Sequence, residues 1–169
     1  MYQIDEKDMV VQLEGAPQSS VGSPRPLVIA DEQSVVLGYY LQEPGIWQLP
    51  EAERGGSGDE SFAIVTLTRC RAHMFGPPND EAFSGHPLAI RGLRPYGTYR
   101  IEHSSWIRQL ERMNSVHPQH CPEGYGELDH LIFAFHDSTF ECVCQGFETR
   151  TGRAHSLQDM VKEAVRMFQ

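Results

Sequence analysis

Apolar and polar side chains alternate with a period of two along much of the chain, a pattern typical of β-strands. The longest alternating stretch covers residues 61–75, where Ala63, Val65 and Leu67 would face one side and the residues between them the other. Shorter β-rich stretches cover 27–30, 35–41 and 98–104, and a weaker one covers 9–15. Polar or Gly/Pro-rich residues separate these stretches, so the pattern predicts several short strands joined by turns.

The clearest local pattern predicts a β-hairpin over residues 130–148. A turn around Asp137–Ser138 would place Phe135 opposite Phe140, whereas a slip of one residue would set Phe135 against Glu141. Burial of apolar side chains on one face is therefore expected to fix the register. Six side chains would share that face: Leu131, Phe133, Phe135, Phe140, Cys142 and Cys144.

Two later segments carry apolar residues at helical spacing instead. The first follows Ser104 or Ser105, either of which can cap a helix, and its apolar positions are Trp106, Leu110 and Met113. The second covers residues 156–168 and is predicted to pack on the sheet through one apolar stripe. The members of that stripe are Leu157, Met160, Val161, Ala164, Val165 and Phe168.

Strand patterns outnumber helices, and the helices come late rather than alternating with strands. This order predicts an α+β fold with a mainly antiparallel, curved β-sheet, barrel- or sandwich-like, and two helices, one of them C-terminal. A chain of 169 residues is expected to form a single globular domain, residues 1–169. The Gly/Ser-rich stretch near 43–61 is expected to be a flexible surface loop. No P-loop or GxGxxG fingerprint is present in the sequence.

Residues 76–97 fit neither periodicity, because they contain four prolines and four glycines. Structureless loops of this length are uncommon in compact domains and often bind ligands. Apolar residues such as Phe83, Leu88 and Leu93 provide enough surface to pin the segment to the body, so a long ordered loop is predicted.

Charged residues are unevenly distributed along the chain, and the basic ones gather around the same region. The formal net charge of −9 argues against nucleic acid as the main partner, since phosphate binding needs a basic face. Residues 69–120 nevertheless hold seven arginines against four acidic residues, and arginine suits the recognition of carboxylates and phosphates. We therefore expect loop 76–97 to bind a small anionic or polar ligand, or a protein partner. Its candidate contacts are Asn79, Asp80, His86, Arg91, Arg94 and Tyr96.

The alternative for this loop is a packed structural role, with its arginines paired to Asp80 and Glu81 at the surface. A different class of function is an enzyme. On the predicted hairpin, His136 and Glu141 would be diagonal neighbours, so the carboxylate could hold the imidazole as a general base. The alternative there is an ordinary hydrogen bond on a sheet.

Metal-assisted hydrolysis is a further possibility. His117 and His120 have a spacing that can chelate zinc, and a distant histidine or carboxylate could complete the site. Eight histidines in one chain also produce close pairs by chance. Cys121, next to His120, is the only cysteine expected in a loop, where it could act as a nucleophile.

The sequence has no secretory leader pattern and no apolar run approaching the ~18 residues of a membrane span. The four cysteines lack CxxC spacing and are expected to be reduced, so a cytoplasmic protein without a membrane partner is predicted. A homodimer formed through an uncovered strand edge is possible. Two hypotheses remain, a ligand- or partner-binding domain and a small enzyme.

Overall fold

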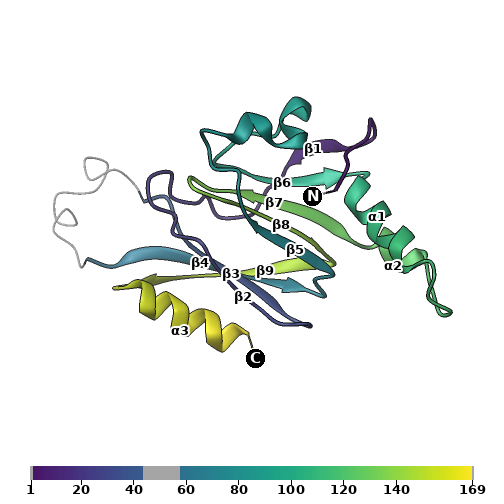
Figure 1. Cartoon of the computed structure of the whole chain (residues 1–169). Coiled ribbons are helices and arrows are strands. Elements are labelled where there is room, and N and C mark those ends of the chain that lie inside the picture. Colours follow the sequence, from purple (N-terminus) through teal and green to yellow (C-terminus); the bar gives the residue numbers. More distant parts are fainter. Residues whose placement is uncertain (1, 44–57, 169) are drawn as a thin grey trace.

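The computed structural model describes residues 2–43 and 58–168, and it contains two antiparallel β-sheets and three α-helices (Figure 1). Most of the stretch predicted as a flexible loop near 43–61 lies outside the described residues. Among the described residues, no helix is both long enough and apolar enough to span a membrane.

The first sheet has five strands in the order β1-β6-β7-β8-β5, and every neighbouring pair is antiparallel. Their bounds are Met9–Gln12 (β1), Thr98–Glu102 (β6), Asp129–Ala134 (β7), Thr139–Cys144 (β8) and Ala72–Gly76 (β5). The second sheet has four strands in the order β2-β3-β4-β9, also antiparallel throughout. Their bounds are Leu27–Ala30 (β2), Val35–Tyr40 (β3), Glu60–Thr68 (β4) and Gly146–Ala154 (β9).

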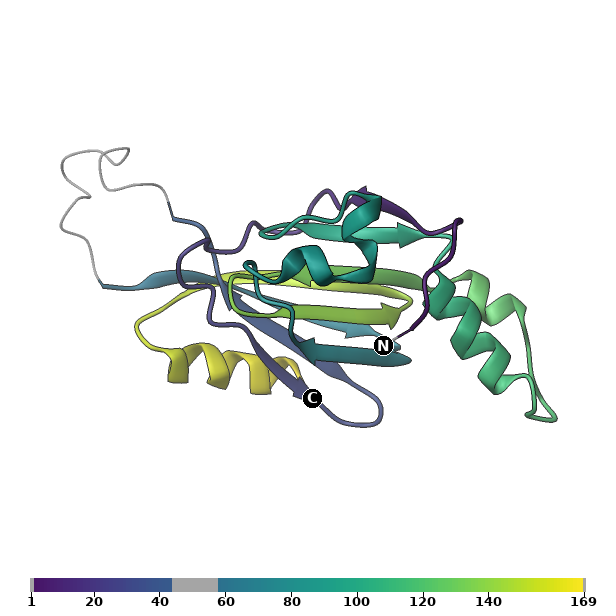
Figure 2. The same cartoon turned by 45° about the horizontal axis from the view of Figure 1, so that its top comes forward.

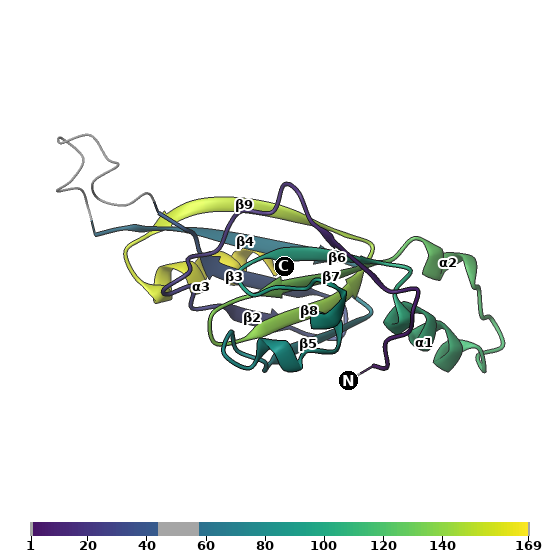
Figure 3. The same ribbon diagram turned by 90° about the horizontal axis from the view of Figure 1, so that it is seen from above.

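The two sheets pack face to face, as seen from above in Figure 3, and do not close into a barrel. Alternate side chains of β3, β4, β7 and β8 meet in one buried layer between the sheets, which is the arrangement of a β-sandwich. The α+β class and the antiparallel, sandwich-like architecture predicted from the sequence are confirmed. The six residues predicted to share one hairpin face are all in this layer.

Each sheet also has a covered outer face. Helix α3 (Leu157–Met167) lies on the outer face of the second sheet, where Met160 and Ala164 are fully buried (Figure 1). Ser156 caps this helix, but Val161 and Val165 are partly exposed, so the buried stripe is narrower than expected.

The outer face of the first sheet is covered by the N-terminal residues and by two 3₁₀ turns within loop 76–97 (Figure 2). Helix α1 projects past the ends of the strands and packs on this layer through Trp106, Ile107 and Leu110. The turns are η3 (Phe83–Gly85) and η4 (Pro87–Arg91), and α1 covers Ser105–Asn114. A short third helix, α2 (Glu123–Gly126), follows α1 and was not predicted from the sequence.

The long strand predicted over 61–75 is two strands that belong to different sheets. Strand β4 ends at Thr68, and β5 begins at Ala72 in the other sheet. Between them Arg69 has a positive φ of 48°, a left-handed conformation that breaks the extended backbone. Alternation of side chains continues across such a break, and for this reason the sequence pattern did not reveal it.

The predicted hairpin forms, but its turn lies one residue earlier than expected. Phe133 pairs with Phe140, and the N–H of Phe135 donates to the carbonyl of Ser138 at 2.9 Å, so His136 and Asp137 form the turn. The pairing is therefore shifted by two residues from the predicted one. Such a shift keeps every side chain on its original face, so burial alone could not distinguish the two registers.

Candidate functional site

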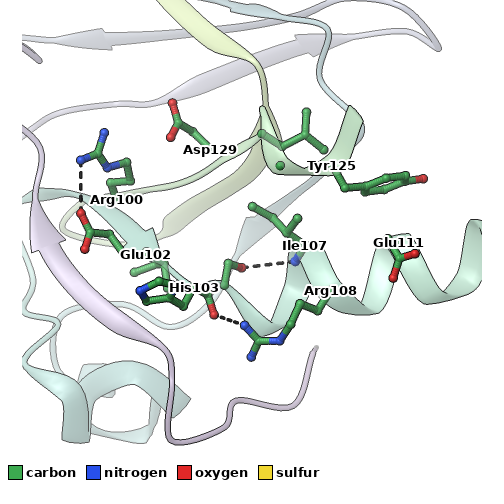
Figure 4. Close-up of a pocket in the computed structure, with 12 residues that line it drawn as sticks. Arg100, Glu102, His103, Ile107, Arg108, Glu111, Tyr125 and Asp129 are labelled. Atoms are coloured by element: carbon green, nitrogen blue, oxygen red, sulfur yellow. Dashed lines mark hydrogen bonds and ion pairs between the residues drawn. The ribbon is translucent and has the colours of Figure 1, made fainter. Parts of the chain in front are cut away.

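A groove of about 560 Å³ lies where α1 and α2 meet the ends of β6 and β7 (Figure 4). We call it the α1–α2 groove. Figure 4 shows Arg100 and Glu102 at one end, Tyr125 and Glu111 at the other, and Ile107 between them. The chain therefore places charged groups at both ends of a cavity that helix α1 borders along one side.

A sharp connection between strand and helix forms one wall of this groove. Strand β6 ends at Glu102, His103 has a positive φ of 53°, and Ser104 then caps α1. The guanidinium group of Arg108, on the first turn of α1, donates a hydrogen bond to the carbonyl of His103. Left-handed backbone at a residue other than glycine is unfavourable, and such residues recur in turns and at functional sites.

The floor and rim of the groove differ in chemistry. Ile101 and Leu128 are buried beneath it, and Ile107 adds a further apolar surface. On the rim, Arg100 pairs with Glu102 at 3.4 Å. Within residues 2–43 and 58–168, the Asp129 carboxylate makes no side-chain hydrogen bond and no ion pair, so it is available to a ligand.

A buried polar cluster lies directly behind the groove. We call it the His–Glu network, and its members are Tyr2, His86, Ser104, His130 and Glu141. Glu141 is at the centre, where it accepts hydrogen bonds from the Tyr2 hydroxyl at 2.8 Å and from His86 Nε2 at 2.9 Å. His130 Nε2 lies 3.2 Å from the same carboxylate, and His130 Nδ1 lies 2.8 Å from Ser104 Oγ.

The surroundings of His86 determine its tautomer. The backbone N–H of Leu88 donates to His86 Nδ1 at 3.1 Å, so this nitrogen carries no proton. The proton must then be on Nε2, the atom that faces Glu141. His86 is therefore a neutral donor to the carboxylate, and it is nearly completely buried.

Glu141 is ionised although it is almost fully buried. Burial alone would raise the pKa of Glu141, but the hydrogen bonds from His130 and His86 outweigh it and bring the pKa down to about 2. Burial and the charge of Glu141 together raise the pKa of Tyr2, so the phenol keeps the proton that it donates. The network is thus a buried carboxylate surrounded by donors.

The N-terminal segment closes the network from outside. The ring of Tyr2 stacks on Trp106 with 5.1 Å between the centroids, and both rings contact His130 edge-on. The buried Asp8 carboxylate accepts a hydrogen bond of 2.6 Å from the backbone N–H of Ser105, at the N-terminus of α1. These contacts tie residues 2–8 to α1 and leave Ser104 as the member of the network that lines the groove.

Loop 76–97 holds most of the ligand contacts predicted from the sequence, but they do not converge on one another. His86 points into the protein and joins the His–Glu network. Arg91 donates to the carbonyl of Asp5 at 3.3 Å, and Arg94 donates to the carbonyls of Ala89 and Leu93. The two arginines are therefore engaged by backbone oxygens, and neither lines any of the grooves described.

The remaining loop residues lie near the tip of the β7–β8 hairpin. The Asn79 side chain accepts from the N–H of Ala82, and the Tyr96 hydroxyl donates to Asp80. The hydrogen bond from Tyr96 lowers the pKa of Asp80. Tyr96 also meets the ring of His136 edge-on, at 6.1 Å between centroids, so Asp80, Tyr96 and His136 are brought together.

The contact predicted between His136 and Glu141 is wrong. His136 lies in the hairpin turn, where its Nδ1 is 2.9 Å from Asp137 and this hydrogen bond raises the pKa of His136. Glu141 lies opposite Ile132 and is bonded to His130 and His86 instead. A carboxylate–histidine arrangement is present, but with different histidines.

His117 and His120 lie on the exposed connection between α1 and α2. His117 Nδ1 accepts from the N–H of Gln119, and His120 lies 2.7 Å from Glu111 and 3.2 Å from Asn114. In the described part of the chain, no group of three or more His, Cys, Asp or Glu side chains could hold a metal ion. Cys121 is exposed and donates to Glu123.

Sequence reasoning missed His103, Ser104, Asp129 and His130 as site residues. Ser104 was recognised only as a helix cap, which it is. His130 could have been found from the hairpin pattern with the correct register, because it lies diagonally across from Glu141. No local pattern marks Asp129, whose role depends on where α1 and α2 are placed.

No protein-family model, curated protein or solved structure matches this chain.

Proposed function

We propose that the protein binds a small polar ligand in the α1–α2 groove. The observation that carries the proposal is the Asp129 carboxylate, which lines the groove and has no partner within the described residues. An apolar floor with a few placed polar groups is the usual composition of a small-molecule site. The volume of about 560 Å³ falls within the range of such sites.

The chemistry of the rim favours a ligand with a hydrogen-bond donor, such as an ammonium or hydroxyl group. Arg100 is paired with Glu102, and Arg108 is paired with Asp5, so their positive charges are already balanced. Asp129 is left as the charged group for a ligand to meet. An amine or polyol would satisfy it, with its carbon atoms against Ile107 and Leu128.

Ligand binding by loop 76–97 stays a separate prediction. The engagement of Arg91 and Arg94 with backbone carbonyls makes that surface the weaker candidate for anions. In the present proposal the loop acts indirectly, because His86 supports the network behind the groove.

The proposal is tested by titrating the protein with ethanolamine, putrescine and glycerol, and with acetate and phosphate for comparison. We expect the donor compounds to raise the melting temperature, and the Asp129→Asn variant to bind them roughly tenfold more weakly because a charge-assisted hydrogen bond is lost. Glu148→Gln, which removes an exposed carboxylate on β9, is the matched control and should bind normally. Equal binding by Asp129→Asn and the wild type, or no response to any donor compound, would contradict the proposal.

A second candidate function is an acid–base enzyme. It is favoured by one observation, the hydrogen bond that connects the groove-lining Ser104 to His130 and through it to the ionised Glu141.

A cytoplasmic location and a homodimer through an edge strand such as β1 or β5 stay predictions.

A further inference from the structure

We infer that Ser104 is a nucleophile for carboxylic ester hydrolysis in the α1–α2 groove, with His130 as its general base and Glu141 as the residue that positions His130. This inference rests on the proposed function, because the ester must occupy the same groove. It goes beyond binding by assigning a covalent step to a named atom, Ser104 Oγ.

The first support is the order of the hydrogen bonds. Ser104 Oγ lies 2.8 Å from His130 Nδ1, and His130 Nε2 lies 3.2 Å from Glu141 Oε2. A serine, an imidazole and a carboxylate in this order form the constellation that activates serine nucleophiles on unrelated folds. The two ring nitrogens are exchanged relative to the usual arrangement, which leaves the direction of proton transfer unchanged.

The second support is the direction in which the protons point. The ionised Glu141 can only accept hydrogen bonds, so the His130 nitrogen that faces it is the donor. In the neutral imidazole the other nitrogen, Nδ1, then has a free lone pair toward Ser104 Oγ. The serine hydroxyl donates to that lone pair, and this is the state from which it can lose its proton.

The third support is the position of Ser104 on the backbone. It follows the left-handed His103 and stands at the N-cap of the ten-residue helix α1, so strand, strained turn and helix succeed one another around the serine. Ser104 itself is only 4% exposed, and it lines the α1–α2 groove. The N–H of Ile107 points at Ser104 Oγ from 3.3 Å, and the positive end of the helix favours a developing negative charge there.

The fourth support is the separation of the groove from the rest of the network. Ser104 lines the groove, whereas His130 is completely buried beside the stacked rings of Tyr2 and Trp106. A substrate can therefore approach the serine only from the groove. Tyr2 and His86 hold the Glu141 carboxylate from its other sides, so they are positioning residues rather than catalytic ones.

The reaction balances without any cofactor. Ser104 Oγ attacks the ester carbonyl carbon, its proton moves to His130 Nδ1, and the carbonyl π electrons pass to oxygen. Collapse of this intermediate breaks the bond to the alcohol, which leaves with the proton from His130. Water then attacks the acyl-serine, again giving a proton to His130, and the released Ser104 takes that proton back.

The substrate class follows from the groove. The apolar surface of Ile107 and Leu128 suits a small acyl or alkyl group, and Asp129 suits an ester that also carries an ammonium or hydroxyl group.

Labelling of the wild-type protein by a fluorophosphonate is the first test, since it needs no variant. Attack by Ser104 Oγ forms a bond to phosphorus and expels fluoride, and peptide mass spectrometry locates the adduct. We expect the label on Ser104. Ser105 is the internal control, because its hydroxyl is buried and without a partner in the described residues but has no imidazole beside it. No adduct, or an adduct on Ser105 instead, would overturn the inference.

Hydrolysis of p-nitrophenyl acetate is the second test. Ser104→Asn removes the nucleophile but keeps a side chain that caps helices well, so the fold should survive. We expect it to lose activity about a hundredfold or more, with Ser105→Ala close to wild type. Activity that Ser104→Asn retains would also overturn the inference.

The two proposals fail separately. If ethanolamine binds in an Asp129-dependent way but Ser104 is never labelled, the nucleophile is wrong and the ligand site stands. If Ser104 is labelled while no donor compound binds, the ligand chemistry proposed for the groove is wrong instead.

Discussion

At the scale of single residues, the Glu141 carboxylate is held by three side chains, those of Tyr2, His86 and His130. This carboxylate is buried on the outer face of the first sheet, yet it stays charged because donors from three distant parts of the chain reach it. A buried charge costs several kcal/mol unless hydrogen bonds compensate for it. The network therefore stabilises the fold only while every partner is present.

We expect Glu141 to make the stability of the protein depend on acid. Its pKa is about 2 in the folded protein and near 4.5 when exposed. The contribution of its charge to the free energy of unfolding is therefore complete above pH 4.5 and is lost as the pH falls toward 2. The shift corresponds to roughly 3 kcal/mol. Urea unfolding measured at falling pH should show this loss in the wild type. In Glu141→Gln the stability at neutral pH should already be lower and the acid-dependent loss smaller, whereas Glu148→Gln should follow the wild type. A Glu141→Gln curve parallel to the wild type would show that the charge of this residue is unimportant.

Whether the sequence predicts the correct histidine partner of Glu141 depends on the register assumed for the β7–β8 hairpin. The argument that paired Glu141 with His136 assumed a turn at Asp137–Ser138, and the same argument with the turn at His136–Asp137 gives His130. A shift of two residues preserves the buried face, so nothing in the hydrophobic pattern could choose between them. His86 was placed in a ligand loop by composition, and its inward position depends on contacts that span 55 residues of sequence.

At the scale of elements, alternation and capping predicted most of the strands and both longer helices. They missed β9, whose sequence is polar and in which only Ala154 is buried, because its place is set by pairing with β4 along nine residues. One pair in that ladder is unusual. Gly152 lies opposite Phe62, and a Cβ atom built on the glycine would come within 2.8 Å of the phenyl ring. The buried ring therefore occupies the space above the glycine.

We expect Gly152→Ala to destabilise the protein by about 1–3 kcal/mol, because the added methyl group must displace a packed phenyl ring. Gly146→Ala is a control in the same strand, since a Cβ there has no atom within 4 Å. Its effect should be small or slightly stabilising, given that alanine restricts the unfolded chain. Midpoints of chemical unfolding measure both changes. Equal midpoints for the two variants would mean that Phe62 moves aside without cost.

At the scale of the whole molecule, four layers follow one another. Helix α3 covers the second sheet, the two sheets share the central core, and the 3₁₀ turns with the N-terminal residues cover the first sheet, where Trp106 at the start of α1 also packs (Figure 1). The chain passes between the sheets three times, from β1 to β2, from β4 to β5 and from β8 to β9. The single domain expected from the sequence stays a prediction, and because of these crossings and the shared core we expect the two sheets to unfold together.

That prediction can be tested by damaging one outer layer and observing the other. Met160 of α3 is fully buried on the second sheet, and Trp106 lies on the far side of the first. Met160→Ala should lower the stability by about 2–5 kcal/mol because it leaves a cavity. In a Trp47→Phe background Trp106 is the sole tryptophan, so its fluorescence reports on the first sheet. If unfolding is cooperative, Met160→Ala should lower the urea midpoint of this fluorescence and that of the far-ultraviolet circular dichroism by the same amount. Val165→Ala, at a position 47% exposed on the same helix, should shift neither signal by more than about 0.5 kcal/mol. If the dichroism of Met160→Ala changes early while Trp106 unfolds at the wild-type urea concentration, the layers are independent units and the idea of a single cooperative domain is wrong.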